Sequence, residues 1–417
     1  MDEQKGILIV GGGISGITTA IEASEAGYNA TIIEKNPYLG GRVAQLFRYF
    51  PKLCPPYCGL EINFKRMKQN PRVTFYTLSE IESISGTEGN FTVKVKVNPR
   101  FVNEKCTDCK ACVEACPVER SNDFNFGMDK TKAIYLPHDL AFPMRYVIDP
   151  KACKGSSCAK CVAACKYNAI DLAMKPETKE LKVGSIVFAT GWNPYDATKM
   201  DNLGFGKVKN VVTNMMMERL SAPNGPTKGK ILRPSDGKEV KSIAFVQCAG
   251  SRDENHLPYC SAICCMASLK QATYLREKNA DSKATVFYID LRTPGKYEDF
   301  LKKVGSDENI TMIKGKVAKI EEVANGDVVV TAEDVVGGSK IRQTFDMVVL
   351  ATGMEPAVKN SGFLSAVKTE ENGFVLSDGQ NAGICAAGVA HRPNDVMTSN
   401  QEGTGAALKS IQSLVRR

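Results

Sequence analysis

A glycine-rich turn near the N-terminus constrains the fold more than any other feature of the sequence. An apolar segment, 7–10, runs into the spacing G-x-G-x-x-G at Gly11, Gly13 and Gly16, and a stretch of helical periodicity follows. A second apolar segment then ends at Glu34. This order of strand, glycine turn, helix, strand and acid is typical of a dinucleotide-binding βαβ unit.

Each of these residues has a physical role in such a unit. Gly11 allows the tight turn, Gly13 lets the backbone approach a pyrophosphate, and Gly16 lets the helix pack on the strand. The N-terminus of the helix, beside Ser15, faces the phosphates, and Glu34 would accept hydrogen bonds from the adenosine ribose. A glycine turn without a ligand is the alternative, and the correctly placed acid argues against it.

Further glycines point to FAD. Gly41 and Arg42 stand where many flavoproteins of the glutathione and thioredoxin reductase type carry a second glycine pair against FAD. Buried strands ending in Ala-Thr-Gly at 189–191 and 351–353 resemble the repeat that closes each nucleotide-binding module of that fold. A last glycine turn ends at Gly388, and a final helix is expected from about Glu402. The candidate cofactor-binding residues are Gly11, Gly13, Ser15, Gly16, Glu34, Lys35, Gly41, Arg42, Ala189, Thr190, Gly191, Gly388 and Val389.

One position departs from the resembled reductases. They place an aspartate that contacts FAD directly after the final glycine, whereas Val389 follows Gly388 here. We therefore expect this contact to come from Asp395 or from backbone groups.

The chain has fifteen cysteines. It has no apolar run of the roughly 18 residues that a membrane-spanning helix needs, and no secretion signal is evident at its N-terminus. In the cytosol thiols stay reduced, so metal binding is expected rather than a disulfide framework.

Two cysteine runs predict a pair of iron–sulfur clusters. The first has the spacing C-x2-C-x2-C-x3-C-P of bacterial ferredoxins, and the second, C-x4-C-x2-C-x3-C, has a longer first gap and Lys166 where proline is usual. In two-cluster ferredoxins the fourth cysteine of each run binds the other cluster. A zinc site is the alternative, but zinc closes with four ligands and has no use for a trailing cysteine in each run. The expected ligand sets are Cys106, Cys109, Cys112 and Cys165 for one [4Fe–4S] cluster and Cys153, Cys158, Cys161 and Cys116 for the other.

A third group comprises Cys248, Cys260, Cys264 and Cys265. It follows an apolar strand, 242–247, and precedes an expected helix, 267–276. A nicotinamide-using relative would carry its own glycine fingerprint at this position, and that fingerprint is absent. We predict a third [4Fe–4S] cluster in its place, with a cluster of reduced or regulatory thiols as the alternative. Adjacent cysteines do not easily both bind one cluster.

The remaining cysteines carry less information. Cys54 and Cys58 leave three interpretations open, namely a redox dithiol facing the flavin, additional metal ligands, or inert thiols in a proline-stiffened loop. Cys385 lies in an apolar strand and is expected to pack in the core. His256, between Cys248 and Cys260, is the histidine most worth following.

Taken with these sites, four segments resemble the heterodisulfide reductase A-subunit family. They are Gln247–Asp253, Tyr259–Ser261, Cys264–Met266 and Gly229–Gly237. The larger members carry a further N-terminal domain and a C-terminal ferredoxin domain. This chain begins at the FAD strand and ends at the FAD helix, so it looks most like the A subunit of the quinone-interacting membrane-bound oxidoreductase (Qmo) of sulfate-reducing organisms.

The resemblance implies an α/β flavoprotein with two dinucleotide-binding domains, as in thioredoxin and glutathione reductases, and an inserted bacterial-type ferredoxin domain with two [4Fe–4S] clusters. The expected domains are 1–98 (FAD-binding, first part), 99–175 (ferredoxin insertion), 176–240 (FAD-binding, second part and linker), 241–342 (degenerate NAD-binding-like domain with the third cysteine group) and 343–417 (FAD-binding, C-terminal part).

The resemblance also implies an electron-transfer subunit that relays electrons between a quinone-linked membrane subunit and adenylylsulfate reductase in sulfate respiration, with FAD as a point where electrons can be split or merged. A second flavoprotein subunit of the same family would be another partner. One alternative is a soluble, bifurcating heterodisulfide reductase subunit with hydrogenase or formate dehydrogenase partners. Another is an NAD(P)H-dependent FAD and iron–sulfur oxidoreductase, against which the missing second glycine fingerprint argues.

Charge excludes one further class of partner. The formal net charge of +8 treats every cysteine as neutral, whereas three clusters with their thiolates and a flavin diphosphate would subtract about 8 charges. The loaded protein would be nearly neutral, and no arginine–aromatic stripe is present, so a nucleic-acid partner is not expected. The expected location is cytoplasmic, on the inner face of the membrane through partner subunits and without direct insertion.

Overall fold

The computed structural model describes residues 6–360, 366–376 and 380–415. The chain forms two compact units. The first contains the chain up to Trp192, Pro356–Arg392 and the segment from Val396 onward, and the second contains Asn193–Glu355 and Pro393–Asp395. The crossings lie at β12 (Trp192–Pro194) and β21 (Met354–Pro356), which pair as a two-stranded sheet. Among the described residues, no helix has the length and apolar character needed to span a membrane.

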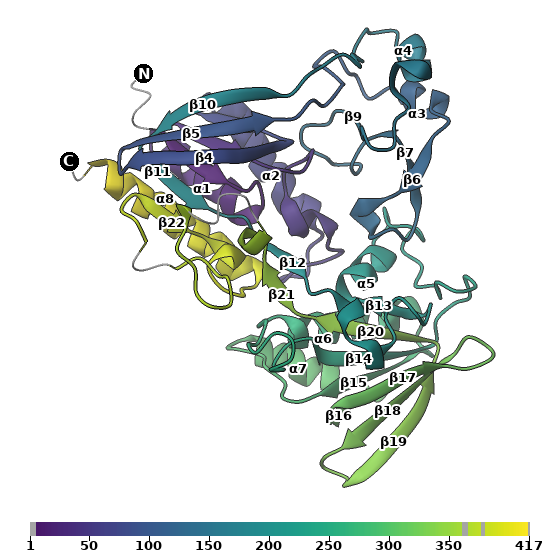
Figure 1. Ribbon diagram of the computed structural model, residues 1–417. Coiled ribbons are helices and arrows are strands. Elements are labelled where there is room, and N and C mark those ends of the chain that lie inside the picture. The colour runs from purple at the N-terminus through teal and green to yellow at the C-terminus, as the bar shows by residue number, and fades with distance from the viewer. Residues whose placement is uncertain (1–5, 361–365, 377–379, 416–417) are drawn as a thin grey trace. The chain divides into compact units, whose positions relative to one another are not determined.

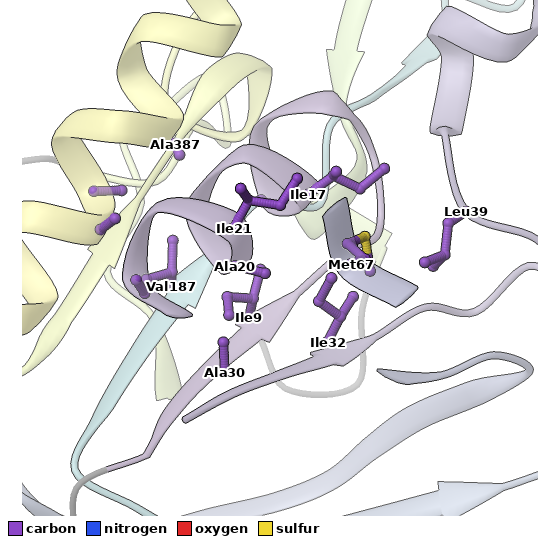
Figure 2. Close-up of a cluster of buried hydrophobic side chains, with 14 of the residues drawn as sticks. Ile9, Ile17, Ala20, Ile21, Ala30, Ile32, Leu39, Met67, Val187 and Ala387 are labelled. Atoms are coloured by element: carbon purple, nitrogen blue, oxygen red, sulfur yellow. The ribbon is translucent and has the colours of Figure 1, made fainter. Parts of the chain in front are cut away.

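A five-stranded parallel sheet is the centre of the first unit (Figure 1). Its order is β22-β11-β1-β2-β3, and one face carries helices α1, α2 and α8. Figure 2 shows Ile17, Ala20 and Ile21 of α1 packed over Ile9, Ile32 and Val187 of the strands. The bounds are β1 Ile7–Val10, β2 Ala30–Ile33, β3 Val73–Tyr76, β11 Ser185–Phe188, β22 Ile384–Ala386, α1 Ile14–Glu25, α2 Pro56–Gln69 and α8 Val396–Val415.

The other face of this sheet packs against a three-stranded antiparallel sheet in the order β10-β5-β4. These strands are β4 (Ser79–Thr87), β5 (Asn90–Val97) and β10 (Glu177–Val183). Successive residues of β1 enter opposite layers, with Ile9 in the helical core and Leu8 in the core between the sheets. Burial on both faces explains why β1 is apolar throughout instead of alternating.

The inserted segment between β5 and β10 consists of short elements around the first two cysteine runs. Two short helices each contain the third cysteine of a run, and the backbone bridge between Val102 and Ile170 closes the segment near its ends. Its core includes Tyr146, Cys112 and Cys161. A core this small is typical of domains that rely on a metal for stability. The bounds are α3 Ala111–Ala115, α4 Lys160–Ala164, β6 Glu119–Ser121, β7 Lys130–Lys132, β8 Ile134–Tyr135 and β9 Val147–Ile148.

The second unit repeats the same architecture. Its parallel sheet has the order β13-β20-β14-β15-β16, and a three-stranded antiparallel sheet, β17-β18-β19, packs through Val328 and Phe345 against Val246 and Leu350. The strands are β13 Val211–Thr213, β14 Ser242–Ala249, β15 Lys283–Tyr288, β16 Ile310–Lys314, β17 Val317–Glu322, β18 Val328–Asp334, β19 Ser339–Phe345 and β20 Met347–Thr352, and the helices are α5 Asn214–Ser221, α6 Cys264–Lys278 and α7 Tyr297–Gly305.

Several boundaries differ from the sequence-based expectation. The sequence places 193–240 and 343–355 with the FAD-binding domain, whereas the structure places both in the second unit, because β13 and β20 are strands of its parallel sheet. Helix α6 was expected from residue 267 but begins at Cys264, with Cys264, Cys265 and Met266 of its first turn buried. Helix α8 begins at Val396, earlier than the expected start near Glu402.

Candidate functional site

The first glycine turn is shaped by close backbone contacts. Gly11 has a φ of +113°, and a Cβ at this position would approach Ala189 O to less than 3.0 Å. A Cβ on Gly16 would meet Gly11 O in the same way, whereas a Cβ on Gly13 would meet nothing within 4 Å. The turn is therefore closed against β11 and α1 and open at Gly13.

The N-terminus of α1 fits an anionic group. Gly13 is the N-cap residue, it provides no side-chain acceptor, and no acidic residue stands in the first turn. The first N–H groups of a helix have no partner within the helix, and they carry the positive end of its dipole. Ser15 is buried here and packs against Gly388, where a Cβ would lie closer than 3.0 Å to the Ser15 hydroxyl.

Glu34 is held inside the turn. Its carboxylate accepts hydrogen bonds from Gly12 N–H at 2.8 Å and from Asn36 N–H and Nδ2 at 2.7 and 2.8 Å. Burial raises the pKa of Glu34 above its usual value, opposed by the hydrogen bonds from Asn36 and Gly12. These three bonds leave lone-pair capacity for a ribose hydroxyl, since a carboxylate has about four acceptor positions. Lys35 beside it is exposed.

The second glycine pair closes over the first. Gly41 has a φ of +55°, and a Cβ there would lie 2.9 Å from the Cα of Gly13. Arg42 donates to Trp192 O at 3.2 Å and to Gln45 Oε1 at 3.1 Å. Burial lowers the pKa of Arg42 below its usual value.

The strand ends complete this cradle. Ala189 is buried, Gly191 has a φ of +66° with open space beside it, and the buried Thr190 Oγ1 has no hydrogen-bond partner among the described residues. An unpaired buried hydroxyl costs about 1–3 kcal/mol. The open space at Gly13, the uncapped helix and this orphaned hydroxyl together fit a bound dinucleotide such as FAD.

Glu402, which the sequence did not single out, holds the last glycine turn. Gly388 has a φ of +63°, and its N–H donates to Glu402 Oε2 at 3.0 Å. Arg392 Nε donates to the other carboxylate oxygen at 3.0 Å, and Val389 is buried. No spacing rule connects α8 to this turn, so the contact was not predictable. The expected alternative, Asp395, accepts a hydrogen bond from Tyr297 at 3.1 Å within the second unit.

We expect Glu402→Ala to lower the free energy of unfolding of the first unit by about 1–3 kcal/mol, because the buried Gly388 N–H loses its acceptor. Glu402→Gln keeps an acceptor oxygen and should lose less. Chemical denaturation of both variants checks this, and equal midpoints for Glu402→Ala and the native protein would contradict it.

The first expected cluster set lines one pocket. Cys106, Cys109, Cys112 and Cys165 all border it, together with apolar residues that include Tyr146. The fourth cysteine of the second run is therefore beside the first three of the first run. Burial raises the pKa of Cys112 to about 12, with Cys106 adding to the rise. A buried thiol at such a pKa stays protonated unless a cation, such as cluster iron, takes the place of its proton.

The second set shows the complementary arrangement in part. Burial raises the pKa of Cys161, and the charges of Cys153 and Cys116 raise it further, so these three lie within electrostatic reach of one another. Cys158 is half-buried beside a short 3-10 turn. Backbone N–H groups donate to cysteine sulfurs in both sets, from Gly155 to Cys153 at 3.3 Å and from Ala169 to Cys165 at 3.4 Å.

These features fit iron–sulfur clusters, whose sulfurs accept backbone N–H bonds from loops with left-handed residues. Such residues stand among the cysteines at Asp108, Lys110 and Ala159. In the parts of the chain that the structure describes, no group of three or more His, Cys, Asp or Glu side chains is arranged so that it could hold a single metal ion. In a [4Fe–4S] cluster each thiolate binds a different iron atom.

The third cysteine group lies on a tightly folded segment, with Cys248 near the end of β14, Cys260 in the loop that follows, and Cys264 and Cys265 in the first turn of α6. Left-handed residues occur at Cys248, Gly250, Arg252 and Ala262. The hydroxyls of Ser251 and Ser261 are both buried and lie 2.8 Å apart, and Met354 N–H donates to Ser261 at 2.9 Å. These hydrogen bonds connect the two arms of the loop and tie it to Met354.

The four thiols of this loop lie within electrostatic reach of one another. Burial raises the pKa of Cys264 strongly, and Cys248, Cys265 and Cys260 each add to the rise. Burial also raises the pKa of Cys248 to about 11. Ala262 N–H donates to Cys260 Sγ at 3.4 Å, the contact seen in the ferredoxin sets. Gln247, next to Cys248, is buried and neither of its amide atoms has a partner among the described residues.

Cys264 and Cys265 differ from the other two in one respect. As thiols, Cys265 donates to Asp290 O at 3.3 Å and Cys264 to Thr352 O at 3.8 Å. A thiolate cannot make these bonds, so binding of a cluster requires both side chains to turn away from the carbonyls. The loop otherwise fits a cluster.

The remaining candidates are separate from these sets. Cys54 is half-buried, Cys58 is exposed in the first turn of α2, and both are free thiols. Burial raises the pKa of nearby Tyr49, and the two cysteines add to the rise. Their three interpretations stay open. Cys385 packs in the core as predicted, and the His256 ring lies 2.8 Å from the Tyr195 hydroxyl.

Comparison with protein families and solved structures agrees with this division. Residues 9–51 match an NAD(P)-binding Rossmann-like domain, and residues 99–119 match a 4Fe-4S binding domain. Thioredoxin reductases share the fold, with TM-scores of 0.52 for the Thermoplasma acidophilum enzyme (14% identity, 98% of this chain and 96% of that chain) and 0.53 for the Lactococcus lactis enzyme (13% identity, 99% and 100%). These findings confirm the predicted fold class and support FAD and iron–sulfur binding.

The similar sequences point to one family. The A subunit of the ferredoxin/F420H2-dependent CoB–CoM heterodisulfide reductase of Methanosarcina acetivorans is 38% identical over 424 residues, which cover 98% of this chain and 53% of that protein. The A subunit of the H2:CoB–CoM heterodisulfide,ferredoxin reductase of Methanothermobacter thermautotrophicus is 35% identical over 422 residues, covering 98% and 64%. The chain spans about half to two thirds of the length of these relatives. Over nearly its whole length, the chain is therefore similar to heterodisulfide reductase A subunits.

Proposed function

We propose that this chain is the FAD- and iron–sulfur-containing electron-transfer subunit of an oxidoreductase complex. The observation that carries the proposal is that the flavin cradle and the ferredoxin cysteines belong to one compact unit and are joined by hydrogen bonds. Leu39 N–H, just before the second glycine pair, donates to Phe142 O in the inserted segment at 2.8 Å. Gln45 donates to Phe124 O of that segment at 3.0 Å and accepts from Arg42.

Arg100 ties the insertion to the same region. Its guanidinium donates to the carbonyl of Pro37, to Thr77 Oγ1 at 3.0 Å and to Arg145 O at 2.9 Å. Burial lowers the pKa of Arg100 to about 10, so it keeps its charge at neutral pH. These contacts fix the ferredoxin segment to the loop that carries Arg42, which is what an electron path between clusters and flavin requires.

FAD, when bound, exchanges electrons singly or in pairs, whereas a cluster passes one at a time. The residues of this chain bind and orient these groups. The glycine turns and the α1 N-terminus would hold the diphosphate, Glu34 would accept hydrogen bonds from the ribose, and the cysteine runs would bind the clusters.

We propose Cys248, Cys260, Cys264 and Cys265 as ligands of a third [4Fe–4S] cluster. Anaerobic iron, acid-labile sulfide and flavin assays on reconstituted protein should give about twelve iron per FAD, and about four fewer in Cys264→Ala. About eight iron, unchanged by the substitution, would return this loop to thiol chemistry.

For the partners, we propose a Qmo-type complex in which the chain relays electrons between a quinone-linked membrane subunit and adenylylsulfate reductase, with a second flavoprotein subunit of the same family. The names of the relatives favour the alternative, a heterodisulfide reductase-type complex in which the chain serves a disulfide-reducing partner. We expect peripheral attachment to the membrane through partner subunits only if the complex is of the Qmo type.

The electron donor and the electron acceptor of the flavin distinguish these two complexes. In the purified complex under anaerobic conditions, a Qmo-type subunit should lose its flavin absorbance on addition of a reduced quinol and regain it with adenylylsulfate reductase and its substrate. Reoxidation by a heterodisulfide instead would favour the alternative. Rapid bleaching by NADH or NADPH would contradict the proposal, since the loop at Gln247–Arg252 lacks a glycine fingerprint for those nucleotides.

A further inference from the structure

Arg252 occupies a central place in the loop that carries the third cysteine group. Its backbone is left-handed, with a φ of +55°, and its N–H donates to Tyr259 O at 3.1 Å. This bond folds the Cys248 arm of the loop back against the Cys260 arm. The Arg252 side chain is about three-quarters buried, with 24% of its surface exposed.

The guanidinium links the two sides of the cysteine group. One terminal nitrogen lies 2.9 Å from Asp290 Oδ2, and the guanidinium charge is within electrostatic reach of Cys248 and Cys260. The backbone carbonyl of Asp290 accepts from Cys265 at 3.3 Å. The Arg252–Asp290 ion pair therefore lies beside the cysteine group.

This placement has an electrostatic consequence. A [4Fe–4S]²⁺ cluster with four thiolates carries a net charge of about −2, and reduction adds one electron and no proton, giving about −3. A positive group close to the ligand sulfurs stabilises the more negative form. A lysine would keep the positive charge without the planar geometry with which a guanidinium pairs with a carboxylate, so it would be a partial substitute.

We propose that Arg252 raises the reduction potential of the cluster bound by Cys248, Cys260, Cys264 and Cys265, and that Asp290 limits this rise by neutralising part of the guanidinium charge. The proposal rests on the third cluster proposed above. Arg252 acts through its charge and is a positioning residue that sets the potential at which the second unit takes up an electron.

Substitution of each partner of the ion pair tests the direction in which the midpoint potential of this cluster moves. In a potentiometric titration with dithionite and mediator dyes, followed by electron paramagnetic resonance, Arg252→Gln should move this midpoint to lower potential and Asp290→Asn should move it higher. At the applied potential that half-reduces the native cluster, the reduced-to-oxidised ratio in Arg252→Gln should fall by about tenfold, which is 59 mV for a one-electron couple. The ferredoxin midpoints should not move in either variant.

Lys316→Gln is the matched control. Lys316 pairs with Asp253 of the same loop at 2.9 Å, but 68% of its side chain is exposed, so solvent screens its charge. Arg252→Lys retains the charge without the planar geometry and should fall between the native protein and Arg252→Gln.

Each outcome decides the proposal. Shifts of Arg252→Gln and Asp290→Asn in the same direction, or no shift in either at full iron content, would overturn the role of Arg252. If Arg252→Gln loses iron, the midpoint is measured in Arg252→Lys and Asp290→Asn instead. An unmoved midpoint in both of these variants would overturn the role of Arg252. A native protein with about eight iron and two titrating clusters would instead overturn the third cluster itself, and the inference with it.

Discussion

Gly16→Ala is expected to abolish FAD binding and to destabilise the first unit. The added Cβ would approach Gly11 O to less than 3.0 Å. That carbonyl cannot retreat, because Gly11 N–H is bonded to Ile33 O at 2.8 Å and a Cβ on Gly11 would itself meet the Ala189 carbonyl. Overpacking lowers the free energy of unfolding by roughly 1–3 kcal/mol, and we expect a value near the upper end here. The distortion would lie in the turn that shapes the diphosphate site. Flavin content after purification and thermal unfolding measure both effects.

Two other glycines serve as controls. A Cβ on Gly405, in α8, would meet nothing within 4 Å, and alanine favours a helix by about 1 kcal/mol over glycine, so Gly405→Ala should retain FAD and stability. A Cβ on Gly13 also has open space in the protein without ligand. Gly13→Ala should therefore fold normally and lose FAD affinity, because the space is that of the pyrophosphate. Full flavin content in both Gly13→Ala and Gly16→Ala would contradict this account of the cradle.

The second large effect concerns the exchange of ligands between the ferredoxin runs. Because Cys165 borders the same pocket as Cys109, the double variant Cys109→Ala/Cys165→Ala should lose one cluster, about four iron. Cys116 lies instead with Cys153 and Cys161, so Cys109→Ala/Cys116→Ala should lose both clusters, about eight iron. Iron and sulfide assays with electron paramagnetic resonance distinguish the two results.

Cys385→Ala is the control for these variants, because Cys385 packs in the core of the first unit and belongs to neither expected ligand set. It should keep the full iron content. A loss of about eight iron in Cys109→Ala/Cys165→Ala, with about four in Cys109→Ala/Cys116→Ala, would mean that each run binds its own cluster.

Local patterns were sufficient for the parts of the fold that depend on neighbours in the chain. The glycine turn at Gly11–Gly16 lies between β1 and α1 as its spacing predicted, since the tight turn and the close helix packing are set within a few residues. The glycines and cysteines are informative because few other residues can replace them at a left-handed turn or at iron.

Contacts between distant segments could not be predicted. Strand β20 lies between β13 and β14 in the sheet of the second unit. Its Ala-Thr-Gly ending is the same as that of β11, which lies in the sheet of the first unit, so the motif does not say to which sheet the strand belongs. The bond from Gly388 to Glu402 and the pair Arg252–Asp290 depend on how separate elements meet, and no spacing pattern encodes them. Helix α6 starts at Cys264 because its first turn packs inward, a tertiary effect that local propensity does not contain.

The central claim is that electrons reach FAD through the ferredoxin clusters, and stopped-flow reduction of the flavin tests it most directly. Chemically reduced ferredoxin would be mixed anaerobically with the native protein and with Cys109→Ala/Cys116→Ala, at matched flavin content. The account predicts rapid loss of flavin absorbance in the native protein and many-fold slower loss in the variant, with Cys385→Ala behaving as native. Equal rates in all three proteins would show that the flavin is reduced directly and would contradict the relay.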